Sequence, residues 1–158
     1  MTRLDTPPFS NRHHPFSAIA RRELLAGHHL ARLACAKDGR PYVVPIYYAY
    51  ADEAFYAFSI PGKKIDWMRS NPQVSVLVES PLPRRQWKSV VADGRYEELP
   101  ERIGHKRQRD RAWSLLSTHT SWWDPGALKP LTPPLADDAR HIFFRIAIEE
   151  ISGREARE

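Results

Sequence analysis

The stretch that decides the fold runs from Leu30 to Ser59 and reads LARLACAKDGRPYVVPIYYAYADEAFYAFS. Three runs within it have the apolar and aromatic content that is typical of strands: 30–37, 41–50 and 54–59. Asp38-Gly39 between the first two runs is a strong two-residue hairpin signal, and 51–53 is a second short turn. The stretch therefore predicts an antiparallel meander of three strands.

The segments on either side extend this pattern. A helix is predicted from the capping residue Ser17 to Ala26, with Gly27 as its stop. A short helix over 63–70 is ended by Asn71-Pro72. We also expect a strand over 73–79, and either a strand pair or one bent strand over 87–98 with a turn or bulge at Asp93-Gly94.

Two further segments complete the expected elements. Residues 100–116 have partly helical spacing after an N-terminal proline. Residues 141–151 alternate, with Ile142 and Phe144 on one side and Phe143 and Arg145 on the other, which predicts a half-buried strand. Sequential strands linked by hairpins favour a mainly β fold, an antiparallel barrel or sandwich with peripheral helices.

Length and composition fit one globular domain of 158 residues with a net charge of +5. We interpret residues 1–16, rich in Pro, His and Arg, as an extended arm, and residues 17–158 as the domain. No apolar run is long enough to span a membrane and the N-terminus has no apolar signal core, so membrane association is not expected. Cys35 as the single cysteine suits a reducing cytoplasm; a buried apolar role is the favoured interpretation and a catalytic thiol the alternative.

The basic run 102–111 raises nucleic-acid binding as one explanation of the charge. Acidic residues interrupt this run and no aromatic residues interleave with it, so a solvated helix face is the favoured interpretation. The histidines have no metal-ligand spacing, and we expect no metal site. Neither a Rossmann fingerprint nor a Walker loop is present.

The segment Ser59-Ile60-Pro61-Gly62-Lys63-Lys64 suggests a phosphate cradle. A helix that begins at the lysines offers unpaired N–H groups and a partial positive charge, to which two ammonium groups and a hydroxyl are added. Two solvated lysines after a plain turn are the alternative, and spacing alone does not separate the two.

Three other segments could contact a ligand. Pro45 within Tyr42-Val43-Val44-Pro45-Ile46-Tyr47-Tyr48 cannot donate to a ladder, which indicates an edge, a bulge or a break that frees backbone groups for a flat heteroaromatic ring. Ser89, near Trp87, could offer a hydroxyl to a buried ligand. Trp122-Trp123 lies in the proline-rich segment 117–139 and could cover an aromatic ligand, contact a partner subunit or anchor the loop. Each segment also has an ordinary structural explanation.

In their order and spacing, these segments resemble the FMN-binding split-barrel proteins related to pyridoxamine 5′-phosphate oxidase, and within them the nitroimidazole-resistance subgroup. The resemblance runs from about residue 24 to residue 153. It rests on five stretches: 39–48 (GRPYVVPIYY), 55–59 (FYAFS) with Gly62-Lys63-Lys64, Asn71-Pro72, 87–98 (WKSVVADGRYEE) and 146–153.

The resemblance implies a homodimer with FMN at the subunit interface. Val44, Pro45, Ile46 and Tyr47 would follow the isoalloxazine with backbone atoms, while Ser59, Lys63 and Lys64 would hold the phosphate. The remaining implied cofactor contacts are Trp87, Ser89, Trp122 and Phe58. Phe58 stands where the nitroimidazole-resistance subgroup often has histidine, so a polar contact is lost there.

The function that follows from this resemblance is an FMN-dependent oxidoreductase acting on a small molecule. Relatives in the wider superfamily use F420, FAD or haem, so a non-catalytic protein that binds flavin, F420 or haem is the alternative. The catalytic residues and the substrate stay open.

Overall fold

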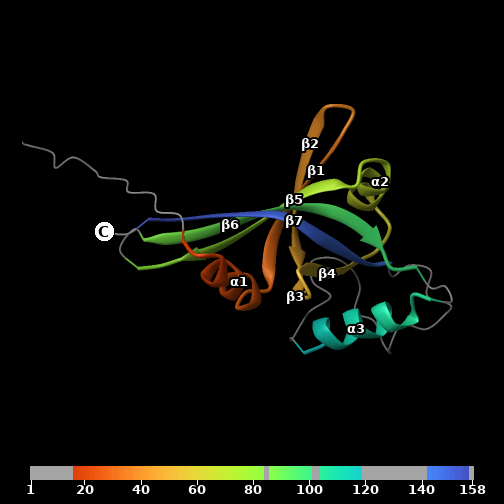
Figure 1. Cartoon of the computed structure of the whole chain (residues 1–158). Coiled ribbons are helices and arrows are strands. Elements are labelled where there is room, and N and C mark those ends of the chain that lie inside the picture. Colours follow the sequence, from red (N-terminus) through yellow and green to blue (C-terminus); the bar gives the residue numbers. More distant parts are fainter. Residues whose placement is uncertain (1–15, 84–85, 101–103, 119–141, 157–158) are drawn as a thin grey trace, which may run out of the picture.

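A computed structural model of the chain describes residues 16–83, 86–100, 104–118 and 142–156 (Figure 1). Its helices are α1 (Ala18–Ala26), α2 (Lys63–Ser70) and α3 (Lys106–Leu116). Its strands are β1 (Leu30–Lys37), β2 (Arg40–Tyr47), β3 (Ala49–Ala51), β4 (Ala54–Ser59), β5 (Gln73–Pro81), β6 (Trp87–Glu98) and β7 (Ile142–Ala156).

The strands form one antiparallel sheet in the order β2-β1-β5-β6-β7-β4-β3. Its two end strands, β2 and β3, are consecutive in the chain and are separated only by Tyr48. Because one residue joins the two ends of the sheet, the sheet must curl until they meet. The expected antiparallel barrel with peripheral helices is therefore confirmed.

Tyr48 is also where the sequence prediction was wrong, because 41–50 is not one strand. The Tyr48 N–H donates to the His29 carbonyl at 2.8 Å, which extends the β1–β2 pairing by one residue beyond Leu30 and Tyr47. The buried Tyr48 hydroxyl donates to the Leu25 carbonyl at 2.7 Å, at the C-terminal end of α1. These two bonds hold Tyr48 at the point where the chain passes from the β1 side of the sheet to the β4 side.

A second core lies between α3 and the sheet, where Phe58, Phe143 and Leu116 pack together. Phe143 is fully buried, so the expectation that it faces the open side of a half-buried strand is wrong. Amphipathic α3 covers that side of β7, and Figure 1 shows this helix beneath β4. Alternation within the strand could not reveal a helix that comes from another part of the chain.

The helix boundaries agree with expectation for α1 and differ for α3. The Ser17 side chain accepts from the Ala20 N–H at 3.2 Å, and the Gly27 N–H donates to the Glu23 carbonyl, as a cap and a stop should. Helix α3 begins at Lys106 rather than at residue 100, because Gly104 has a φ of 104°, which no helix accommodates.

β6 is one strand with a register shift at Asp93/Gly94, which confirms a bulge in a single bent strand.

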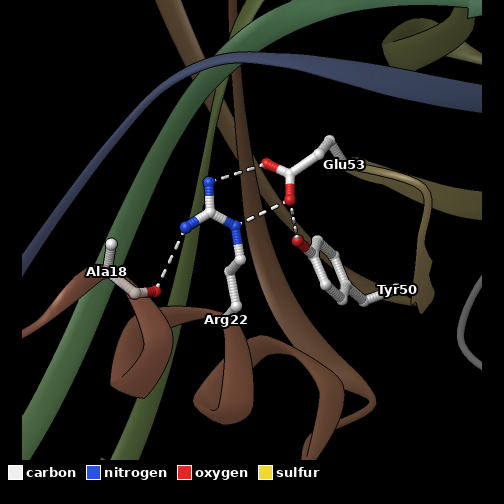
Figure 2. A network of polar contacts seen from close by, with 4 residues as sticks. All are labelled: Ala18, Arg22, Tyr50 and Glu53. Atoms are coloured by element: carbon white, nitrogen blue, oxygen red, sulfur yellow. Dashed lines mark hydrogen bonds and ion pairs between the residues drawn. The ribbon is translucent and has the colours of Figure 1, made fainter.

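The tight turn between β3 and β4 is held by two ion pairs. Asp52 and Glu53 both have positive φ. Arg22 of α1 donates to the Glu53 carboxylate through two N–H groups, at 2.7 and 3.2 Å, and the Tyr50 hydroxyl donates to the same carboxylate (Figure 2). Arg111 of α3 pairs with Asp52 at 2.7 Å. The turn therefore ties two helices to one end of the sheet.

Two arginines of the basic run 102–111 make contacts within the chain. Arg109 is buried, donates to the Leu99 carbonyl at 2.9 Å and lies over the Phe143 ring, while Arg111 pairs with Asp52 as described. Among the described residues, no helix is long and apolar enough to cross a membrane. The predicted arm, apart from residue 16, and most of the segment 117–139 lie outside the described residues.

Candidate functional site

The two lysines predicted to hold a phosphate begin α2. Helix α2 starts directly after Gly62, and no side chain caps its N-terminus. Lys63 is exposed and Lys64 is half-buried. Among the described residues, neither ammonium has a carboxylate within 4.0 Å. Two cations and uncapped N–H groups therefore share one helix end, which is the donor set that suits an anionic group.

Lys64 lies close enough to the buried Cys35 of β1 for the two groups to influence each other electrostatically. Burial lowers the pKa of the Lys64 ammonium. Burial also raises the pKa of the Cys35 thiol, and the nearby charges of Lys63 and Lys64 partly oppose that rise. The expected apolar role of Cys35 agrees with its burial. A half-buried cation without an anionic partner is unfavourable, and a bound phosphate would relieve this cost.

Lys63 lies over two aromatic rings. Its Nζ is 4.4 Å from the centroid of the Tyr42 ring and 4.6 Å from that of the Trp67 ring. The two ring centroids are 5.6 Å apart. The sequence placed Tyr42 in the candidate segment 42–48 but predicted no contact of either ring with Lys63, although Trp67 follows Lys63 by four residues, which is one helical turn. That spacing was the available signal.

Ser59 and Phe58 end β4 with their side chains in different surroundings. Ser59 is buried, and its hydroxyl donates to the Ile60 carbonyl at 2.8 Å. Phe58 packs in the second core, with its ring 5.3 Å from that of Phe143. Phe58 is thus part of the packing under α3.

β2 ends the sheet order, so Pro45 lies on a strand with one unpaired backbone edge within the described structure. The prediction of an edge position for this proline is confirmed. Side chains alternate along β2: Val44 and Ile46 turn toward the barrel core, whereas Pro45 and Tyr47 turn outward.

Trp87 and Ser89 lie at the start of β6, away from α2. Both line a cleft of about 590 Å³ together with Leu77 and Glu79. Tyr47 lines a neighbouring cleft of about 630 Å³, which also includes Leu77 and Glu79. The outward residues Tyr47, Trp87 and Ser89 are therefore grouped along one outer surface of the sheet.

Within one chain, the predicted site residues thus fall into two groups. Lys63 and Lys64 lie on α2, which packs against the core-facing side of β1 and β2, whereas Tyr47 and Ser89 lie on the outer side. One copy of the chain does not bring them around a single ligand. Trp122 and Trp123 lie outside the described residues.

Comparisons with known proteins agree with this architecture. The family model for pyridoxamine 5′-phosphate oxidase matches residues 18–155. An uncharacterized protein of Rhizobium meliloti (strain 1021) is 50% identical over 133 residues, which span 84% of this chain and 88% of that protein.

Two solved structures share the fold. A FAD-binding protein from Mesorhizobium loti is 59% identical, with a TM-score of 0.77 over 92% of this chain and 99% of its own. A putative 5-nitroimidazole antibiotic resistance protein from Bacteroides thetaiotaomicron is 16% identical, with a TM-score of 0.70 over 93% and 92% of the two chains, a likeness of fold alone. The chain therefore belongs to the pyridoxamine 5′-phosphate oxidase family of flavin-binding split-barrel proteins.

Proposed function

We propose that this protein is a flavin-dependent oxidoreductase that acts on a small molecule and works as a homodimer. The observation that carries the proposal is the pair of lysines at the uncapped start of α2, one of them half-buried, for which the described residues supply no carboxylate. Such a site suits the phosphate that a flavin nucleotide carries and riboflavin lacks.

Each group of residues has its own task in this proposal. Lys63, Lys64 and the Ser59 hydroxyl hold the phosphate, and the free backbone edge of β2 at 44–47 lies along the isoalloxazine. A bound flavin supplies the hydride or electron transfer, and the protein binds, orients and polarises it. No side chain is assigned as a general acid or base.

A second copy of the chain would unite the two groups. The outer side of the sheet exposes large apolar side chains on β1, β2 and β6, with Leu30 at 44%, Val43 at 60% and Val91 at 38% exposure. An uncovered apolar sheet face of this kind suits a partner surface. In the proposed dimer, Trp87 and Ser89 of one copy approach the flavin held by the lysines of the other.

FMN and FAD share the isoalloxazine and the first phosphate, so the same residues would hold either one. FMN is the prediction from sequence, whereas the 59% identical relative is described as FAD-binding. We propose FAD as the resident cofactor, because that identity extends over nearly the whole of both chains.

The purified protein provides the test. Its visible spectrum, followed by release of the cofactor and chromatography against FAD, FMN, F420 and haem, identifies the cofactor directly. A colourless protein that takes up none of the flavins would contradict the proposal. Oxidation of NAD(P)H with an added electron acceptor then separates an oxidoreductase from a non-catalytic flavin, F420 or haem carrier.

A further inference from the structure

We infer that Tyr42 and Trp67 are positioning residues that hold the Lys63 ammonium in place for the nucleotide phosphate. This inference rests on the proposed function, since it assigns a role to two rings beside the proposed phosphate site. Neither ring is among the cofactor contacts that the family resemblance implies.

The two rings reach Lys63 from different elements. Trp67 comes from the same helix, α2, and Tyr42 from β2, where it lies opposite Cys35 of β1. Both rings are only partly buried and pack at the margin of the main core. The arrangement therefore depends on the packing of α2 against the β1–β2 hairpin and not on the helix alone.

The Lys63 ammonium contacts the two rings although a carboxylate, that of Asp66, lies only three residues along the same helix. Asp66 follows Lys63 by three residues in the first turn of α2, a spacing at which helical ion pairs form. No Lys63–Asp66 ion pair occurs; the Nζ instead lies 4.4 and 4.6 Å from the two ring centroids. Ring faces attract the cation without neutralising it, so its charge stays available to an anion.

Holding this side chain has a physical benefit. A free lysine loses much of its rotamer freedom when it binds a phosphate, and that loss weakens binding. An ammonium has three N–H donors and no acceptor, so ring contact on one side leaves donors on the other. The rings therefore reduce the ordering cost at the phosphate without using up the donors that the phosphate needs.

Tyr42→Leu tests the inference, with Tyr42→Phe as its matched control because Phe keeps the ring. The measurement is the ratio of the dissociation constants for FMN and riboflavin, in each variant alone and combined with Lys63→Ala. A cation–π contact at an exposed site corresponds to about a 2- to 5-fold change in affinity. We expect Tyr42→Leu to reduce the preference for FMN by that factor, Tyr42→Phe to retain most of it, and Tyr42→Leu to add nothing once Lys63 is alanine.

A second readout needs no flavin. After reductive ¹³C-methylation of the lysines, which keeps their charge, the Lys63 methyl resonances should show a ring-current shift that Tyr42→Leu removes and Tyr42→Phe preserves. An equal loss of FMN and riboflavin binding in Tyr42→Leu, or an effect that persists with Lys63→Ala, would overturn the positioning role alone. A Lys63→Ala protein with an unchanged FMN preference would overturn the proposed phosphate site, and the inference with it.

Discussion

Gly94 of β6 lies directly against Ala147 of β7, so that a Cβ at position 94 would stand 2.5 Å from the Ala147 carbonyl oxygen and 2.8 Å from Ile146 Cγ2. The contact sits at the bulge where the β6–β7 register shifts. We predict that Gly94→Ala destabilises the protein by about 1–3 kcal/mol, because backbone on a central strand cannot move aside cheaply. Urea unfolding measures this loss.

Gly62→Ala is the matched control for that measurement. No atom lies within 4 Å of a Cβ at position 62, and its φ of 176° is extended backbone that any residue adopts. Its stability should stay within about 0.5 kcal/mol of the wild type. Equal stability of the two glycine variants would contradict the close approach at the bulge.

Removal of the two lysines should weaken the binding of flavin nucleotides much more than the binding of riboflavin, which has no phosphate. Charge-assisted bonds of this kind contribute about 1.5–3 kcal/mol each, so Lys63→Ala with Lys64→Ala should weaken FMN and FAD by at least about 100-fold and riboflavin far less. Titration of the cofactor-free protein, followed by flavin fluorescence, gives the three affinities.

The control for this loss of charge is Lys106→Ala with Arg107→Ala on α3, where both side chains are exposed. This variant removes the same two positive charges at a distance from the proposed site. If it weakened FMN as much as the α2 variant does, long-range attraction by the net charge would explain the effect, and the cradle would be misassigned.

Binding of the nucleotide should depend on pH through Lys64. Burial lowers the pKa of this ammonium, whereas a bound phosphate favours the charged form, so binding takes up a proton wherever free Lys64 is neutral. Affinity for FMN should therefore be full below the lowered pKa of Lys64 and fall as the pH rises through it. Isothermal titration in buffers of different ionisation enthalpy measures the proton uptake.

Lys64→Arg removes this dependence in the same experiment, because a guanidinium stays charged over the whole range. Riboflavin supplies the second comparison: it shares the titration of the isoalloxazine but has no phosphate. A pH profile that is the same for FMN and riboflavin, or unchanged in Lys64→Arg, would count against a role for Lys64 at the phosphate.

Local signals in the sequence were sufficient to predict most of the strands and helix α1. The Asp38-Gly39 turn fixed the β1–β2 hairpin, and Asp93-Gly94 marked the bulge of β6. Barrel closure at Tyr48 was missed because the bonds that hold this residue go to His29 and Leu25, about 20 residues earlier. The burial of Phe143 was missed because a helix from another part of the chain covers it.

The candidate site shows the same division. Lys63 and Lys64 were recognisable from the start of a helix after Pro61-Gly62. The aromatic pair beside them was not, because Tyr42 reaches Lys63 only through the packing of α2 on the β1–β2 hairpin. Nor could spacing indicate that Tyr47 and Ser89 lie on the side of the sheet opposite the lysines.

The proposed dimer makes the last prediction, at Val43. This side chain is 60% exposed on the outer side of the edge strand β2, so Val43→Glu should leave the fold of one chain intact. In a dimer that covers this face, the carboxylate would be buried without a partner, which costs several kcal/mol per ion. We therefore expect a monomer in analytical ultracentrifugation. If the second copy completes the site, flavin content should fall in parallel, although no lysine is changed.

Ile19→Glu on α1, at a side chain that is 71% exposed, introduces the same charge elsewhere and should stay dimeric with its flavin. A Val43→Glu protein that remains a flavin-loaded dimer would exclude this face as the interface, because no dimer that buries it could tolerate two unpaired carboxylates there.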